Sequence, residues 1–171
     1  MNYHNITYPD MNNGDGLRVA LWLSGCSHHC NNCQNPQTWN PSNGIKFDDI
    51  AFDELLDELR KDYISGLTIT GGDPLFEDNV DEVYNLCVFI KRILPHKTIW
   101  IYTGYTWEEL QSDKYKNYER RLVLKHCDVA VDGKYIEELR DITLKWRGSS
   151  NQRVINVTES LKQNKVVLYC D

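Results

Sequence analysis

The sequence has no long apolar run, no excess of positive charge and no export signal. None of its apolar runs approaches the roughly 20 residues that a membrane-spanning helix needs. Its 19 basic against 25 acidic residues give a net charge of −6, which argues against a nucleic-acid partner. The first 15 residues show no basic region followed by an apolar core, so no secretory signal is expected. We therefore expect a cytoplasmic protein without a membrane or nucleic-acid partner.

The composition does contain an unusual number of cysteines for such a chain. There are six among 171 residues, and 41% hydrophobic residues are enough for a folded core without disulfides. Three of them, Cys26, Cys30 and Cys33, lie within eight residues, whereas Cys87, Cys127 and Cys170 are scattered. Reduced, clustered thiols in an intracellular protein favour metal binding or catalysis. We expect Cys87 and Cys127 to be small buried hydrophobes.

Three interpretations of the clustered cysteines are open. Their i, i+4, i+7 spacing would place them on one face of a helix, but the surrounding Ser, Gly, Asn and Pro residues are poor helix formers. A zinc site would need a fourth ligand such as His28 or His29, and zinc ligands usually come in two separated pairs. We expect both histidines to be exposed loop residues without a ligand role. An iron–sulfur cluster on three thiolates would leave one iron open to a substrate.

The rest of the chain alternates between apolar strand-like runs and amphipathic helical segments. Strands are expected at 17–23, 66–70, 98–103 and 128–132, and with less support at 153–157 and 166–169. Helices are expected around 52–63, after Asn79, after Thr106 and over 115–126. Asn79 with Glu82, and Thr106 with Glu109, match the capping pattern of a helix start. This alternation predicts an α/β fold with a parallel sheet.

Each of the four clearer strands ends in a polar cluster. The cysteines follow the first strand and Gly71-Gly72-Asp73-Pro74 follows the second. Thr103 ends the third, and Asp132 and Lys134 lie at the end of the fourth. Because the carboxyl ends of parallel strands meet at one edge of a sheet, these clusters are expected to form a single site.

The Cys-x3-Cys-x2-Cys motif resembles the cluster motif of the radical S-adenosylmethionine (SAM) enzymes. The resemblance implies a [4Fe-4S] cluster on Cys26, Cys30 and Cys33, with SAM at the open iron. It also implies one radical SAM domain over residues 1–171, folded as an open, truncated (β/α) partial barrel with parallel strands. Its cofactor-binding residues would be Gly71, Gly72, Asp73, Thr103, Asp132 and Lys134, with no catalytic side chain among them. In that family the glycine turn holds the SAM amino group, and the strand-end aspartate and lysine serve the ribose or a cation and the methionine carboxylate.

Longer stretches narrow the resemblance. Thr38-Trp39-Asn40 and the segment from Trp146-Arg-Gly-Ser to Asn-Gln-Arg153 are similar to glycyl-radical activating enzymes, in the branch that acts on anaerobic ribonucleoside-triphosphate reductase. That reductase would be the protein substrate, and a low-potential donor such as flavodoxin would supply electrons. A complete eight-unit barrel takes about 250 residues, so this shorter chain would need its partner to close the site.

Two residues depart from the pattern of the family. Asp73 stands where glutamate is commoner, and Asn32 stands where an aromatic residue often touches adenine. Two other functions stay open at this point. One is the activation of another glycyl-radical enzyme, such as pyruvate formate-lyase, and the other is a non-enzymatic zinc-binding interaction module.

Overall fold

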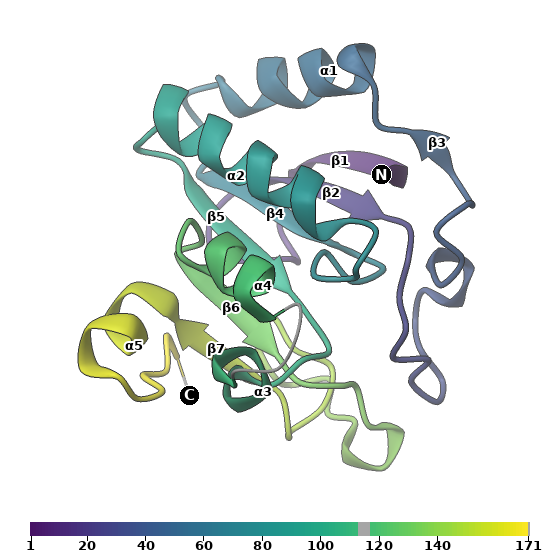
Figure 1. The fold of residues 1–171 in the computed structure, drawn as a ribbon, viewed down its shortest axis with the longest axis vertical. Coiled ribbons are helices and arrows are strands. Elements are labelled where there is room, and N and C mark those ends of the chain that lie inside the picture. The colour runs from purple at the N-terminus through teal and green to yellow at the C-terminus, as the bar shows by residue number, and fades with distance from the viewer. Residues whose placement is uncertain (113–116, 171) are drawn as a thin grey trace.

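The computed structural model describes residues 1–112 and 117–170, and a mixed sheet runs through the centre of this part of the chain (Figure 1). The strand order is β3-β1-β2-β4-β5-β6-β7. The four central strands are parallel: β2 (Arg18–Leu23), β4 (Gly66–Gly71), β5 (Thr98–Tyr102) and β6 (Val129–Asp132). The outer strands β1 (Asn2–Asp10), β3 (Ile45–Lys46) and β7 (Arg153–Asn156) each pair antiparallel with their neighbour.

The four central strands confirm the predicted α/β architecture with a parallel core, and the edges of the sheet differ from the all-parallel expectation. β1 had not been predicted, and only a short loop joins it to β2, which allows an antiparallel pair but not a parallel crossover. β7 follows β6 without an intervening α-helix and also runs antiparallel. The strand expected at 166–169 is reduced to one bridge, between Leu168 and Ile155.

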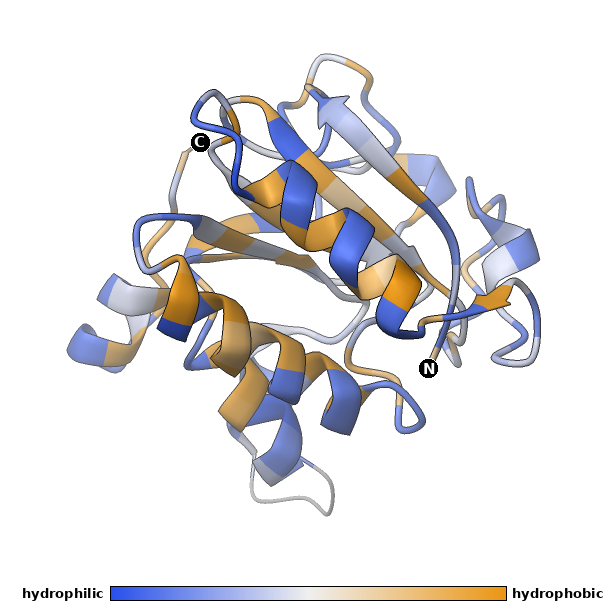
Figure 2. Cartoon of the chain, turned by 90° about the horizontal axis from the view of Figure 1, so that it is seen from above, coloured by the Kyte–Doolittle hydropathy of each residue, from blue (hydrophilic) through white to orange (hydrophobic). Residues whose placement is uncertain are grey.

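Helices cover one face of the sheet. Figure 1 shows α2 (Val80–Ile93) and α4 (Asn117–Leu124) in front of the strands and α1 (Asp49–Leu59) above them. Hydrophobic and hydrophilic residues alternate along these helices in Figure 2, and their apolar residues join the strands in one core cluster. The short helices α3 (Trp107–Gln111) and α5 (Val157–Gln163) lie at the β6–β7 side. No helix in the described part of the chain is both long and apolar enough to cross a membrane.

The two predicted capping pairs have different outcomes. Thr106 and Glu109 form the reciprocal capping box at the start of α3, as predicted. Asn79 does precede α2, but its side chain does not cap the helix. Its amide instead donates hydrogen bonds to the carbonyl oxygens of Ser24 (2.7 Å) and Asp73 (3.2 Å). Glu82 pairs with the amino group of Met1. The predicted capping box at Asn79 is therefore wrong, because the amide joins two loops of the site described below.

The helical segments otherwise lie close to their predicted places. α1 lies a few residues earlier than the predicted segment 52–63. α4 occupies the later part of the predicted helix 115–126, of which residues 115 and 116 lie outside the described residues. Cys87 and Cys127 are both buried in the core, which confirms that prediction.

Candidate cofactor site

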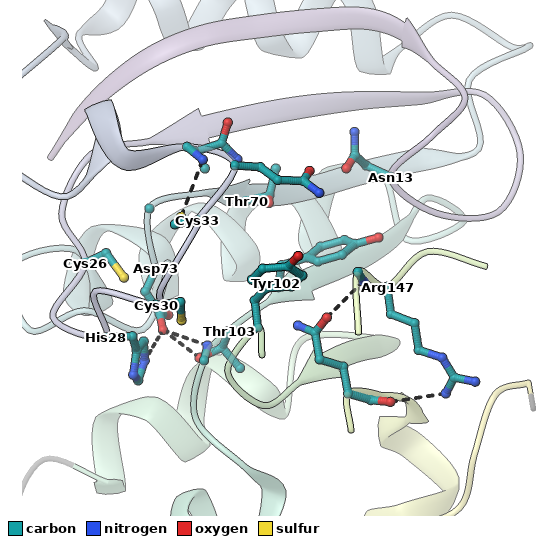
Figure 3. A pocket seen from close by; sticks show the side chains of 18 of the residues that line it. Asn13, Cys26, His28, Cys30, Cys33, Thr70, Asp73, Tyr102, Thr103 and Arg147 are labelled. Atoms are coloured by element: carbon teal, nitrogen blue, oxygen red, sulfur yellow. Dashed lines mark hydrogen bonds and ion pairs between the residues drawn. The ribbon is translucent and has the colours of Figure 1, made fainter. Parts of the chain in front are cut away.

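A cavity of about 400 Å³ opens at the carboxyl ends of the central strands (Figure 3). Seven of the predicted site residues line it: Cys26, Cys30, Cys33, Gly71, Gly72, Asp73 and Thr103. They come from the ends of three neighbouring strands, β2, β4 and β5. The structure thus brings together the clusters after these strands. Asp132 and Lys134 are not among the lining residues, although Gly133 and Tyr135 of the same loop are.

The cysteine loop starts directly after β2 and contains no helix, so the helical-face interpretation of the three cysteines is wrong. Two backbone hydrogen bonds fix the base of the loop, from the N–H of Gly25 to Thr38 O (2.7 Å) and from the N–H of Cys26 to Trp39 O (3.0 Å). Within the loop, His29 and Asn32 have positive φ angles of 45° and 53°. These left-handed residues turn the chain so that all three thiols reach the cavity wall.

The thiols are partly exposed and free of disulfides. Burial raises the pKa of the Cys26 thiol to about 11, and hydrogen bonding from the backbone of His28 acts in the opposite direction. Burial also raises the pKa of Cys30, and the backbone of Tyr135 and the charge of Lys134 oppose that shift. The backbone N–H of Asn35 donates to the Sγ of Cys33 (3.4 Å). The protein thus directs backbone donors at the three sulfur atoms and a positive charge at Cys30. Burial makes the Cys26 and Cys30 thiols costly to ionise, and a metal bound to them would offset that cost.

These features fit an iron–sulfur cluster. Such clusters are held by cysteine thiolates, and hydrogen bonds to the sulfur atoms set their potential. Within residues 1–112 and 117–170, no three His, Cys, Asp or Glu side chains converge on a point that could hold a single metal ion. The three thiols instead share the wall of one cavity that also has room for a small molecule.

The glycine turn after β4 packs directly against the start of the cysteine loop. The N–H of Gly72 donates to Leu23 O and the N–H of Asp73 to Gly25 O, both at 2.7 Å. Gly71 has a φ of +99°, and a Cβ at this position would lie 2.7 Å from the nitrogen of Leu23. A Cβ at Gly72 would lie 2.5 Å from the oxygen of Gly25. Both glycines are therefore required by the close approach of two backbones, beside a cavity where a ligand could meet bare backbone.

Asp73 is buried, and protein groups surround its carboxylate. Its Oδ2 accepts hydrogen bonds from Thr103 Oγ1 and the N–H of Gly104, both at 3.0 Å, and its Oδ1 accepts one from the N–H of Leu75 at 2.8 Å. The Nε2 of His28 lies 2.7 Å from the same Oδ2. The carboxylate therefore ties the turn to the neighbouring strand end, and Thr103 is committed to the same network.

The two loop histidines differ from each other. The prediction of an exposed His28 is wrong, since 7% of its side chain is exposed and its ring packs on Tyr105. The ring is buried because it pairs with Asp73, a partner 45 residues away in the sequence. His29 is exposed, as predicted, and its ring stacks on Trp39 at a centroid distance of 4.7 Å.

The end of β6 is built differently. Asp132 is buried, and its carboxylate accepts hydrogen bonds from the side chain of Arg153 (2.5 and 3.0 Å) and the N–H of Trp107 (2.7 Å). Arg153 also pairs with Glu108. Lys134 is exposed, and its charge acts on Cys30. The cofactor-binding roles predicted for Asp132 and Lys134 stay predictions, without a place on the cavity wall.

Residues that the sequence did not single out complete the cavity. The side-chain oxygen of Gln152 accepts hydrogen bonds from the N–H groups of Gly148 (2.9 Å) and Ser149 (3.2 Å), and its amide donates to Gly133 O (2.9 Å). Gln152 lies in the stretch whose resemblance was noted above, but no pattern in the sequence pairs it with the end of β6. Tyr102, the last residue of β5, also lines the cavity, and its hydroxyl is buried without a hydrogen-bond partner among the described residues.

Comparison with known proteins places this site in a class. Residues 12–155 match the family model described as a 4Fe-4S single cluster domain. That span includes the three cysteines, the glycine turn and the four central strands, so the class that the fold and the site define is a single-cluster iron–sulfur protein.

Named relatives narrow the class further. The chain is 44% identical over 161 residues to the anaerobic ribonucleoside-triphosphate reductase-activating protein of Enterobacteria phage T4, covering 94% of this chain and 97% of the relative. Proteins of the same name in Haemophilus influenzae and Escherichia coli K12 are 42% and 39% identical, and the matches cover 89% and 90% of this chain and 96% and 97% of the relatives. The chain belongs to the family of anaerobic ribonucleoside-triphosphate reductase-activating proteins.

Proposed function

We propose that the protein is a radical SAM activase that generates a glycyl radical on an anaerobic ribonucleoside-triphosphate reductase. Cys26, Cys30 and Cys33 would hold a [4Fe-4S] cluster, and SAM would occupy the adjoining cavity. The observation that carries this proposal is the shared cavity wall, in which three thiols from one loop stand next to the glycine turn of the neighbouring strand. Three thiolates leave one iron without a protein ligand, and the rest of the cavity adjoins that position.

The chain's own groups would bind and orient the cofactors. The bare backbone at Gly71 and Gly72 would let the amino group of SAM approach main-chain carbonyl oxygens. Thr103 would act through Asp73, which it holds in place. When bound and reduced, the cluster supplies one electron for the cleavage of SAM, which yields methionine and a 5′-deoxyadenosyl radical that abstracts hydrogen from the partner.

The loop after β6 would form the opposite wall of the cavity. Gly133, Tyr135 and Gln152 line it, and the Gln152 amide holds the loop by donating to Gly133 O. Asp132 and Lys134 remain in the proposed site, but with supporting roles in place of direct contacts with SAM. Asp132 would fix the position of the loop, and Lys134 would bring positive charge to the rim, near Cys30.

The partner and the fold class belong to the same proposal. Relatives that cover nine-tenths of the chain carry the name of the reductase-activating protein, which favours the reductase over pyruvate formate-lyase as the protein substrate. The four parallel strands with their helices would be the core of an open, truncated partial barrel within one radical SAM domain over residues 1–171. The partner would close its open side, and a low-potential donor such as flavodoxin would reduce the cluster.

The activity is tested with protein reconstituted anaerobically with iron and sulfide. On addition of SAM and a strong reductant, methionine and 5′-deoxyadenosine are expected in equal amounts. The absence of both products while the cluster is intact would reject the proposal. Peptides from the glycyl-radical regions of the reductase and of the lyase, supplied side by side, distinguish the two activase functions. Zinc without iron or sulfide in anaerobically purified protein would instead support the interaction module.

The cluster ligands are tested by single substitutions. Cys26→Ala, Cys30→Ala and Cys33→Ala are each expected to abolish stable cluster loading, measured as iron and sulfide per chain. Cys87→Ala is the matched control, because its thiol is buried in α2 away from the cavity. That variant is expected to load normally and to lose about 1 kcal/mol of stability from the lost sulfur contacts. Normal loading of the Cys30 variant would contradict the ligand set.

A further inference from the structure

The side chain of His28 lies in the middle of the cysteine loop, between Cys26 and Cys30. Its Nε2 lies 2.7 Å from the Oδ2 of Asp73, which belongs to the glycine turn (Figure 3). Both groups are buried, with 7% and 2% of their side chains exposed. A polar pair of this kind makes a strong local connection, because so little of either side chain is exposed that water competes weakly for the bond.

Two further contacts enclose the imidazole ring. The ring of Tyr105 meets it edge to face at a centroid distance of 4.6 Å. Gly104 lies so close that a Cβ there would stand 2.3 Å from the Cδ2 of His28. The ring is therefore held in one orientation, by its neighbours as well as by Asp73.

The wall behind His28 is itself anchored to the glycine turn. The guanidinium of Arg120 lies 4.3 Å from the centroid of the Tyr105 ring. The Nε of Arg120, a buried residue, donates a hydrogen bond to the carbonyl of Leu75, two residues after Asp73. His28, Tyr105, Arg120 and the turn thus form one packed unit, which fixes the middle of the cysteine loop relative to the end of β4.

The backbone bonds between these two segments lie elsewhere. The bond from the N–H of Asp73 to Gly25 O joins them at the base of the cysteine loop, before Cys26. Cys30 and Cys33 come later in the loop, whose path includes two left-handed residues. The bond between His28 and Asp73 lies closer to these later thiols, so it can fix their distance from the glycine turn.

We propose that His28 is a positioning residue, which fixes the distance between the cluster-binding thiols and the SAM-binding turn through its bond to Asp73. The inference rests on the proposed function, since it assigns His28 a part in holding two cofactors in register. His28 lines the cavity, but its Nε2 faces Asp73, so the proposed role is to position the loop and not to contact a cofactor. The role requires the ring nitrogen that meets Asp73, so a side chain that supplies a donor at the same reach should replace it.

The test compares two amides that differ by one methylene group. Gln places its amide nitrogen near the position of the histidine Nε2, whereas Asn is too short to reach Asp73. His29→Asn is the matched control in the same loop, because His29 is exposed and Asn tolerates its left-handed backbone. For each variant we would measure the unfolding midpoint of the apoprotein, the hydrogen exchange of amides 26–33, the iron and sulfide content, and the dissociation constant for SAM.

His28→Asn is expected to speed the exchange of the loop amides about tenfold or more and to weaken SAM binding to the loaded protein by a similar factor. His28→Gln should lie within about threefold of the wild type in both measurements. The spectrum of the reduced cluster should change on SAM addition in the wild type and in His28→Gln, and less in His28→Asn. His29→Asn should match the wild type in loop exchange, cluster content and SAM affinity, with at most a small drop in unfolding midpoint from the lost contact with Trp39.

Wild-type exchange rates and SAM affinity in His28→Asn would overturn the inference. A loss in His28→Gln as large as in His28→Asn would overturn it too, because the ring's packing and not its bond to Asp73 would then matter. If the wild-type protein loads no cluster or binds no SAM, the proposed function fails and the inference fails with it. A wild-type protein that loads and binds, beside an unaffected His28→Asn, rejects the inference alone.

Discussion

Asp73 and Asp132 both lie at the ends of parallel strands, both are buried, and both are surrounded by protein donors, yet they organise different parts of the cavity. Asp73 accepts from Thr103, Gly104 and Leu75 and faces His28, so it joins the cysteine loop to the glycine turn. Asp132 accepts from Arg153 and from the backbone of Trp107, so it joins β6 to β7 and to α3. One carboxylate lies on the cavity wall and the other behind it.

The difference shows that some residues of the site fix the positions of its loops, whereas others face the cavity. A buried carboxylate with several donors is stabilised only while those donors stay in place, so it fixes the loops that supply them. The lining of the cavity includes the thiols and the glycine backbone at one strand end, and Gly133, Tyr135 and Gly148 at the other. If the two strand ends differ in this way, substitutions at them should change the stability of the protein and its affinity for the cofactors to different extents.

The largest difference is expected between two glycines with nearly the same backbone conformation. Gly71 and Gly133 have φ angles of +99° and +93°. A Cβ at Gly71 would lie 2.7 Å from the backbone of Leu23, whereas the nearest atom to a Cβ at Gly133 would be 3.8 Å away. Gly71→Ala should cost about 3–5 kcal/mol of stability, from steric overlap added to backbone strain. Gly133→Ala should cost about 1–2 kcal/mol, from the strain alone.

Chemical denaturation of the two apoproteins measures this difference directly. Equal losses of stability would mean that the close approach of the β4 turn to β2 contributes nothing, and the comparison of the two strand ends would lose its structural basis. A Gly133→Ala protein that folds normally can also be loaded with cluster, which tests whether the β6 loop tolerates a side chain beside the cofactors.

The central architecture was predictable because local patterns carry it. The runs that became β2, β4, β5 and β6 are apolar and bounded by turn residues, since strands in the middle of a parallel sheet are buried on both faces. β1 was not predicted because its sequence is polar and largely exposed, so it has no apolar run, and its pairing with β2 depends on residues outside β1. For the edge strand β7, the sequence indicates a strand but not whether that strand runs parallel or antiparallel to β6.

The candidate site was predictable at its backbone positions and less so at its side chains. Thiols and glycines after a strand indicate which loop faces the cavity, and this held for Cys26 to Cys33 and for Gly71 and Gly72. The surroundings of His28, Asn79 and Asp132 depend on partners that are 45, 55 and 21 residues away in sequence. No local spacing encodes such partners, so the buried state of His28 and the linking role of Asn79 needed the structure.

A smaller effect, of about 2 kcal/mol, is expected from Asp132→Asn. The substitution removes the charge that Arg153 meets at 2.5 Å in a buried position and keeps the shape of the side chain. Glu108→Gln is the matched control, because Glu108 is the more exposed partner of the same arginine and should contribute less than about 1 kcal/mol. If Asp132 only supports the loop, the loaded Asp132→Asn protein should bind SAM within about threefold of the wild type.

The measurement also decides the role that the sequence had suggested for Asp132. A loss of SAM affinity beyond tenfold, in a variant whose unfolding curve still shows a folded protein at the assay temperature, would place Asp132 in contact with the cofactor. Asp132 and Asp73 would then be more alike in function than their positions relative to the cavity indicate.

The smallest effect is expected at the rim of the cavity, from Lys134→Gln. The positive charge of Lys134 lowers the pKa of the Cys30 thiol against the larger, opposite effect of burial. Without that charge the pKa rises further, so less thiolate is present at any pH below it and alkylation of Cys30 in the apoprotein should slow about two- to threefold at pH 8. The alkylation rate should rise with pH in both proteins, and 0.5 M salt should reduce the difference in rate between them.

Lys165→Gln, a change at another exposed lysine, is the control for this measurement. Equal alkylation rates for Lys134→Gln and the wild type at low salt would show that the Lys134 ammonium does not act on Cys30. The loop after β6 would then have no electrostatic effect on the cysteine loop.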